Sequence, residues 1–211
     1  MSFYDATKRI MDILISLIGI VVGAPLMLFA ALWIKVVSPG GPILADTPLR
    51  VGKDGKNFKF YKFRSMIPKA HEWLLAHPEL LKKYQENNFK LDPDPRLLPG
   101  GKFMRKFSVD ELPQFFNILK GEMSFVGPRA YYPFEVDKQL EEHPNLEGLM
   151  QTVYTVKPGL TGLWQISGRS SLSFEARVKL DASYAQKRSL LYDLMIILKT
   201  PFVVLTGKGA Y

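Results

Sequence analysis

The longest apolar run of the chain lies near its beginning. From Ile13 to Ile34 the sequence reads ILISLIGIVVGAPLMLFAALWI, without a charged side chain. A straight helix of roughly 20 residues rises by about 30 Å, which is the thickness of the hydrocarbon core of a bilayer. The run therefore predicts a helix that enters a membrane.

Two features of this run argue against a straight crossing. Ala24 and Pro25 lie in its middle, and an interior proline loses a backbone hydrogen bond and collides with the preceding turn. We therefore expect a sharp kink, with two halves that are each too short to reach the far side of a bilayer. Lys8 and Arg9 precede the run and Lys35 follows it, and positive residues favour the cytoplasmic side. These charges favour a re-entrant hairpin formed by residues 1–36. A single span and a secretory signal peptide are the alternatives.

The rest of the chain, residues 37–211, has the pattern of a separate domain. The segment SPGGP ends the apolar region, and Asp54-Gly55 between alternating apolar and basic residues predicts a two-stranded ribbon. The glycines of residues 156–171 predict that the backbone there lies close to another chain segment or a ligand. Apolar periodicity and composition predict helices at 68–88, with an interruption at Pro78, and at 111–120, 173–185 and 189–205. We expect an α+β fold, mostly helical, in which the re-entrant membrane helix precedes a small cytosolic catalytic domain with a short β-ribbon.

Charge and cysteine content narrow the chemistry. The chain has 28 Lys and Arg against 20 Asp and Glu, a net charge of +8, which favours nucleic acid, acidic lipid headgroups or phosphorylated small molecules as partners. It has no cysteine, which excludes disulfides, thiolate nucleophiles and cysteine-ligated metal sites. His71, His77 and His143 lack the spacing of a histidine metal site, and we expect them at the surface.

The segment SVDELPQ at residues 108–114 places two carboxylates side by side. Ser108 followed three residues later by Glu111 matches a capping box, in which two side chains satisfy free N–H groups of a helix's first turn. Pro113 favours a later register with Asp110 as the cap, because the proline then falls in the first turn, where its missing N–H costs nothing. In that register Asp110 lies at the mouth of a helix closed by Gly121.

Basic residues flank this helix start. Lys102, Arg105 and Lys106 precede it, and Arg129 follows it. A carboxylate at a phosphate site usually comes with a divalent cation, and Mg²⁺ suits this role because it bridges carboxylate and phosphate oxygens. An aspartate can also carry a phosphoryl group covalently. The residues alone indicate membrane attachment and metal-dependent phosphate chemistry, without defining a reaction.

Ordered motifs along nearly the whole chain resemble the bacterial sugar transferase family, the monotopic phosphoglycosyl transferases, in its short form. Any one of these motifs would be weak evidence, but the ordered set is highly specific. The matching segments are Lys8-Arg9 and Asp12, KFRSM at 62–66, DPR at 94–96, SVDELPQFFNILKGEMSFVGPR at 108–129, KPGLTGLWQISGR at 157–169, and SLLYD at 189–193.

The resemblance implies a reaction and a set of site residues. Such enzymes move a sugar 1-phosphate from a UDP-sugar to a polyprenol phosphate with Mg²⁺, through a covalent intermediate, and release UMP. Asp110 would be the nucleophile, and Glu111 its partner in holding the metal or activating the acceptor. The helix would turn at Ala24-Pro25. The implied phosphate-binding residues are Arg105, Lys62, Arg64, Arg129 and Arg169.

The resemblance also implies partners and a location. These are the UDP-sugar, polyprenol phosphate and membrane lipid, without nucleic acid and with homo-oligomers allowed, on the cytoplasmic face of the bacterial inner membrane. The chain departs from the family pattern at Asp46-Thr47, Ser65 and Ala130. The sugar, the polyprenol and the pathway stay open. The alternative function is a non-catalytic, membrane-tethered basic module that binds anionic lipid or nucleic acid.

Overall fold

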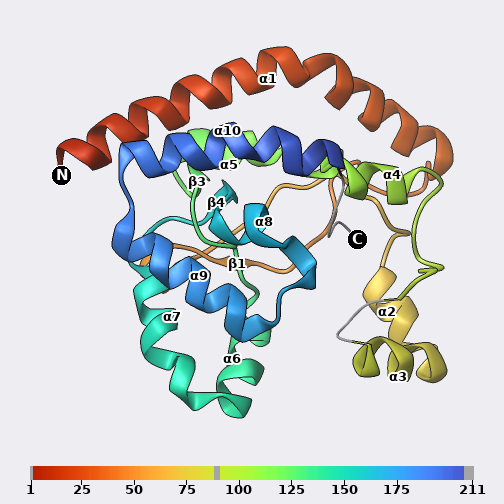
Figure 1. Cartoon of the computed structure of the whole chain (residues 1–211). Helices are drawn as coiled ribbons and strands as arrows, with labels where there is room; N and C mark the ends of the chain where they lie inside the picture. Colours follow the sequence, from red (N-terminus) through yellow and green to blue (C-terminus); the bar gives the residue numbers. More distant parts are fainter. Residues whose placement is uncertain (1, 88–90, 207–211) are drawn as a thin grey trace.

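The computed structural model describes residues 2–87 and 91–206 and is mostly helical (Figure 1). Residue 88 of the predicted helix 68–88, and residues 207–211 of the predicted domain, lie outside the described residues. The helices are α1 Phe3–Val37, α2 Ala70–Leu75, α3 Pro78–Glu86, α4 Gly101–Lys106, α5 Gln114–Lys120, α6 Pro133–Glu142, α7 Glu147–Tyr154, α8 Leu163–Ser167, α9 Phe174–Lys187 and α10 Leu190–Thr206. Short 3₁₀ turns are η1 Lys53–Gly55, η2 Val109–Glu111, η3 Pro144–Leu146 and η4 Arg169–Ser171.

The apolar run forms one continuous helix, α1, which arches over the rest of the molecule in Figure 1. It is long and apolar enough to cross a membrane. The proline at position 25 lies inside the helix without ending it, so the helix is bent in Figure 1 but the predicted division into two separate halves is not observed. A proline removes one hydrogen bond, and the turns on either side keep theirs, so the helix bends and continues. The re-entrant path through a membrane stays a prediction.

The inner face of α1 is docked onto the domain near both of its ends. Asp12 and Ser16 are buried near the first end, and Ala30 and Ile34 near the second. Beneath the second end, Ala30 and Ile34 pack with Phe63 and other buried apolar side chains. The outer face is exposed and apolar, with Ile18, Val21, Val22, Leu28 and Phe29 among its residues.

Charged residues at the start of α1 make specific contacts with the domain. The two terminal nitrogens of Arg9 donate to the carbonyl oxygens of Ile118, at 2.6 Å, and Leu119, at 2.7 Å, near the C-terminal end of α5. Asp12 accepts from the Ser124 hydroxyl at 2.9 Å and from the Phe125 backbone N–H at 2.8 Å. These residues therefore fix the position of the helix, in addition to any role as flanking charges.

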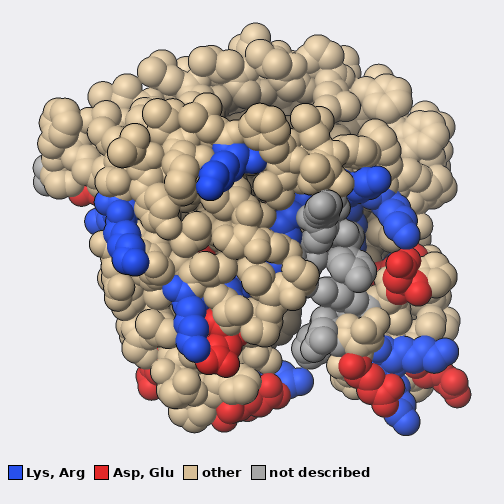
Figure 2. Space-filling model, in the orientation of Figure 1, with Lys and Arg blue, Asp and Glu red and all other residues tan. Residues whose placement is uncertain are grey.

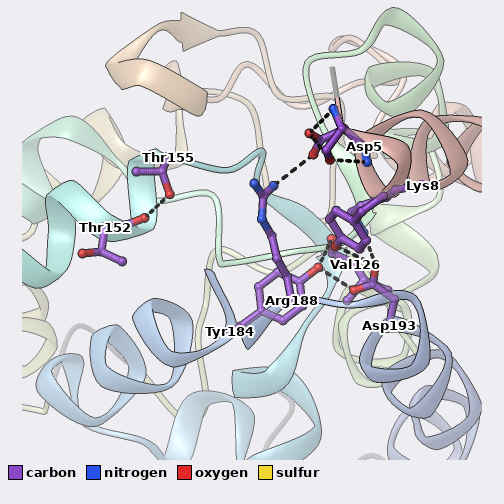
Figure 3. A network of polar contacts seen from close by, with 10 residues as sticks. Asp5, Lys8, Val126, Thr152, Thr155, Tyr184, Arg188 and Asp193 are labelled. Atoms are coloured by element: carbon purple, nitrogen blue, oxygen red, sulfur yellow. Dashed lines mark hydrogen bonds and ion pairs between the residues drawn. The ribbon is translucent and has the colours of Figure 1, made fainter. Parts of the chain in front are cut away.

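A second set of polar contacts joins α1, α9 and α10 (Figure 3). Asp193 of α10 accepts from Lys8 at 2.8 Å, Tyr4 at 3.0 Å and Tyr184 at 2.6 Å. The Tyr184 hydroxyl also lies 3.1 Å from the carbonyl oxygen of Val126. Because Asp193 is buried, these donors compensate for the removal of its charge from water.

The described strands form two small sheets. The predicted ribbon is present, with β1 Arg50–Val51 antiparallel to β2 Asn57–Phe58. The second sheet, β3 Ser124–Val126 parallel to β4 Gly159–Thr161, was not predicted, because its strands are three residues long and lie among prolines and glycines. A Cβ atom on Gly159 or Gly162 would collide with the backbone of Gly127, which confirms the predicted close backbone approach.

Predicted helices and surface histidines compare well with the structure. Two helices, α2 and α3, occupy the predicted 68–88 region, and α9 and α10 lie within two residues of their predicted bounds. Helices α4, α6, α7 and α8 were not predicted. The three histidines are exposed, as expected.

The surface divides by polarity. Figure 2 shows that the crest of α1 carries no charged side chain in this view, whereas the acidic residues gather mainly toward the opposite end of the molecule. Helix α10 adds further exposed apolar side chains, namely Leu191, Leu198, Phe202 and Leu205. The two helices thus present a large apolar surface, whose exposure to water is unfavourable. Such a surface is typical of contact with lipid.

Candidate active site

The acidic pair lies in a 3₁₀ turn that precedes α5. Ser108 adopts a left-handed conformation, with φ of 56° and ψ of 24°, and makes no side-chain cap. Helix α5 begins at Gln114, directly after Pro113, and ends before Gly121 as predicted. Both predicted caps are therefore wrong: an N-cap needs an extended backbone that Ser108 does not have, and the helix starts too late for Asp110 to cap it.

Asp110 is buried against a lysine from the KFRSM segment. Its side-chain oxygen Oδ2 lies 2.7 Å from Lys62 Nζ, and the residue is 1% exposed. Its backbone carbonyl accepts from the Phe63 N–H at 2.8 Å, which fixes the two segments side by side. The ammonium group compensates a carboxylate that would otherwise be costly to bury. Lys62 and the Phe63 backbone therefore fix the position of Asp110.

Glu111 has a different environment from its neighbour. It is partly exposed and lines a cavity of about 180 Å³ formed by η2, α5, β4, α8 and α10. Arg169 lines the same cavity and donates through Nη2 to the Ser108 hydroxyl at 2.8 Å. The structure thus brings Asp110, Glu111, Lys62 and Arg169 together around one turn.

Arg129 lies against the face of Trp164 in α8. Its Cζ atom is 5.0 Å from the ring centroid, and that of Arg177 is 5.5 Å from the same ring. Arg177 also pairs with Glu135, at 3.5 Å. Burial lowers the pKa of Arg177, and the nearby charge of Arg129 lowers it further. The charge of Arg129 acts unfavourably on Arg177, and an anion bound near the two guanidinium groups would offset this repulsion.

Asp181 is a buried carboxyl group that binds the backbone of Arg129. Its Oδ2 atom accepts from the Arg129 backbone N–H at 3.0 Å and from the Tyr131 hydroxyl at 2.8 Å. Complete burial raises the pKa of Asp181 to about 7, although these hydrogen bonds and the nearby arginines oppose the shift. The carboxyl group positions the backbone of Arg129 and does not line the cavity beside Glu111.

Arg50 lies within electrostatic range of both Arg129 and Glu111. It is buried, donates to the Ala130 carbonyl at 2.8 Å, and has its Cζ atom 3.2 Å from the ring centroid of Tyr132. Burial lowers its pKa to about 10, and among the charges that act on it are those of Arg129 and Glu111. The charges of Arg129 and of the acidic pair's Glu111 therefore both act on the same buried arginine.

Two predicted phosphate-binding residues have other contacts. Arg64 is directed toward the turn after α1, where its guanidinium donates to Ser38 and to the Pro42 carbonyl. Arg105 donates through Nε to the Ser65 hydroxyl at 2.9 Å. We therefore leave Arg64 out of the proposed phosphate site and keep Arg105 as a prediction.

The acidic pair offers a sparse set of metal ligands. Among the described residues no group of three or more His, Asp or Glu side chains could hold a metal ion. Mg²⁺ often binds through only one or two carboxylates, with substrate phosphates and water as its other ligands. Asp110 and Glu111 therefore fit a Mg²⁺ ion that arrives with a phosphorylated substrate, and they do not fit a metal bound by protein alone.

Sequence reasoning missed Arg50, Trp164, Arg177 and Asp181. The only signal for the last two was their spacing of four residues within a predicted helix, which places them on one face. That spacing is also typical of an exposed ion pair. Their burial depends on α9 packing against α7 and α8, which local sequence does not reveal.

Comparison with known proteins gives consistent matches along the chain. The sequence model of a family described as bacterial sugar transferase matches residues 3–207. The undecaprenyl-phosphate galactose phosphotransferase of Salmonella typhimurium is 42% identical over 207 residues, which cover 97% of this chain and 41% of that protein. The exopolysaccharide production protein ExoY of Sinorhizobium fredii is 38% identical over 209 residues, covering 97% of this chain and 88% of that protein.

A third relative has a different sugar in its name. The UDP-glucose:undecaprenyl-phosphate glucose-1-phosphate transferase of Escherichia coli is 35% identical over 209 residues, which cover 97% of this chain and 41% of that protein. The chain thus spans about two fifths of the length of the Salmonella and Escherichia relatives.

Proposed function

Because the chain belongs to the bacterial sugar transferase family, we propose that it transfers a sugar 1-phosphate from a UDP-sugar to a polyprenol phosphate at the cytoplasmic face of a bacterial inner membrane. The names of two relatives specify undecaprenyl phosphate with galactose or glucose. They support the reaction class and leave the sugar open. The observation that carries the proposal is the buried Asp110, paired with Lys62 and directly followed by Glu111 at a cavity.

In the first step Asp110 acts as the nucleophile. One of its carboxylate oxygens attacks the phosphorus that carries the sugar, and a new O–P bond forms. The bond from that phosphorus to the bridging oxygen breaks, and UMP leaves with the electron pair. The sugar phosphate stays on Asp110 as an acyl phosphate. Lys62 holds the carboxylate in place for the attack.

In the second step the polyprenol phosphate attacks the same phosphorus. An oxygen of its phosphate forms the new O–P bond, and the bond to Asp110 breaks, which regenerates the carboxylate. The product is a polyprenol diphosphate sugar. Glu111 faces the cavity from which this acceptor would approach, so the two carboxylates have different roles.

Asp110 and Glu111 would hold Mg²⁺ together with the diphosphate of the donor. The bound ion would neutralise charge on the phosphate oxygens during both transfers. The charges of Arg129 and Glu111 both act on Arg50, and we assign Arg129, together with Arg177 at the same Trp164 ring, to the donor's phosphates. Arginine suits phosphate because its planar fork donates two parallel hydrogen bonds.

A panel of UDP-sugars tests this function. We expect repeated turnover with UMP release from one or a few of them, dependent on Mg²⁺ and on undecaprenyl phosphate, and abolished by EDTA. Asp110→Asn should remove the activity, whereas Asp54→Asn, the same change in the exposed ribbon turn, should keep it. No UMP from any UDP-sugar, together with salt-sensitive binding to anionic vesicles that ignores Asp110→Asn, would instead indicate the non-catalytic basic module.

A further inference from the structure

The cavity beside Glu111 has a composition that fits one particular substrate. We propose that it binds the phosphate end of the polyprenol phosphate, with the phosphate at Arg169 and the first isoprene units along α10. This inference rests on the proposed function and adds to it the place and the residues that bind the acceptor.

The walls of the cavity are mostly apolar. They come from segments that are distant in sequence, including η2, β4, α8 and the last turns of α10. The apolar lining includes Leu112, Phe115, Leu160, Ile166, Val203 and Val204. Sugar hydroxyls would lose hydrogen bonds to water against such walls, whereas an isoprene unit gains by leaving water.

The polar side of the cavity offers an anion site. Arg169 uses Nη2 to bind the Ser108 hydroxyl, but its Nη1 atom is buried without a hydrogen-bond partner. A buried donor without a partner is costly, and rotation of the guanidinium toward the cavity would let a phosphate oxygen satisfy it with a charge-assisted bond. Glu111 lies on the same cavity, so a phosphate there would be next to the reacting pair.

The size of the cavity suits the end of a long chain. Its volume of about 180 Å³ is below the roughly 300–1,000 Å³ of pockets that enclose a whole drug-sized ligand. A polyprenol must therefore continue outside it. Helix α10 provides the continuation, because Phe202 and Leu205 on its other face are both 72% exposed. An acceptor that diffuses in lipid could enter between this apolar surface and the cavity.

Helix α8 separates this cavity from the arginines assigned to the donor. Trp164 contacts Arg129 and Arg177, whereas the next two residues, Gln165 and Ile166, line the cavity. The lipid of the acceptor and the nucleotide of the donor would then lie on opposite sides of one short helix. Their phosphates would use the same position at Asp110 in turn, because each displacement is in line with the bond between the Asp110 oxygen and phosphorus. This arrangement suits a reaction in which the donor product leaves before the acceptor reacts.

The experiment compares Val203→Trp with Leu198→Trp in the full chain. Val203 lines the cavity, whereas Leu198 of the same helix is 62% exposed. We expect Val203→Trp to lower kcat/KM for undecaprenyl phosphate at least tenfold, while the burst of UMP formed without acceptor stays within twofold of wild type. Leu198→Trp should change neither quantity. Arg169→Gln should also raise the KM for the acceptor.

A binding measurement separates this inference from the proposed function. Native mass spectrometry with undecaprenyl phosphate should give a bound fraction that falls at least tenfold in Val203→Trp, even if no UDP-sugar tested yields UMP. If Val203→Trp lowers the melting temperature, Val203→Met and Arg169→Gln must weaken acceptor binding in its place. Unchanged acceptor KM and binding in these variants, or an equal loss of burst and turnover, would overturn the inference.

Discussion

Asp110 and Glu111 are adjacent in sequence but differ in what surrounds them. Asp110 is 1% exposed and paired with Lys62, whereas Glu111 is partly open to a cavity that also contains Arg169. The two residues are consecutive in the 3₁₀ turn η2, where Asp110 is buried and Glu111 is partly exposed. The proposed roles, with Asp110 as the nucleophile and Glu111 as its partner, come from the family resemblance and assign different tasks to these two environments.

At Asp181 the structure predicts a pH dependence of stability. Its pKa is about 7 in the folded chain and about 3.9 in an unfolded one, so between these values only the folded chain holds the proton. The contribution of this group to the free energy of unfolding is therefore full below about pH 4 and is lost as pH rises to about 7, by at most about 1.4 kcal/mol per pH unit.

Asp181→Asn tests this prediction, because the amide can still accept from Arg129 and Tyr131 but does not titrate. Denaturant unfolding at several pH values should give a wild-type free energy that falls, relative to the variant, between pH 4 and pH 7. Parallel curves for the two proteins would contradict it.

Motifs predicted the acidic pair, but they could not tell which basic residues join it. Lys62 and Arg64 are two positions apart in KFRSM, yet Lys62 reaches Asp110 and Arg64 reaches Ser38. Their partners are set by how α1 and the following turn pack on the domain. Long-range packing of this kind leaves no periodic signal in a single sequence.

At the scale of elements, α1 is positioned by close packing on α5. A Cβ atom on Gly19 would lie 2.5 Å from the ring of Phe115, whereas one on Gly23 would have only the end of Met27, at 4.0 Å. Gly19 therefore allows the helix to approach, and Gly23 has no such role.

Gly19→Ala and Gly23→Ala form a matched pair. Each replacement gains about 1 kcal/mol of helix propensity. We expect Gly23→Ala to raise the melting temperature in detergent, and Gly19→Ala to leave it unchanged or lower it, because the ring of Phe115 must move. Equal increases in the two variants would show that α1 is not packed on α5 as described.

The long or strongly patterned elements were predictable, and the short ones were not. Helix α10 has a clear apolar composition, and α9 begins after the capping residue Ser173. Helices α4 and α8 have six and five residues, lack a side-chain cap and depend on tertiary contacts. The parallel pair β3 and β4 needs three glycine backbones to meet, which composition hinted at without giving the pairing.

At the scale of the whole molecule, one face is apolar and the other is charged. The crest of α1 and the outer side of α10 expose apolar residues, and both helices are joined to β3 through Asp193 and Tyr184 (Figure 3). A membrane on this face would place the acceptor cavity next to lipid and the arginines on the aqueous side.

The topology of α1 is open to a direct test, because the chain has no cysteine of its own. Single-cysteine variants Phe3→Cys and Gly40→Cys place exposed thiols near the two ends of α1. We expect both to react with a membrane-impermeant maleimide from the cytoplasmic side only. Labelling of the two positions from opposite sides would establish a spanning helix.

The covalent intermediate is the central claim, and intact-protein mass spectrometry tests it most directly. The full chain is incubated with the UDP-sugar that releases UMP, with Mg²⁺ and without acceptor. We predict a mass increase of one sugar phosphate on wild type and Asp54→Asn, none on Asp110→Asn, and its loss when undecaprenyl phosphate is added. Turnover without any adduct on wild type, and undiminished in Asp110→Asn, would contradict the mechanism.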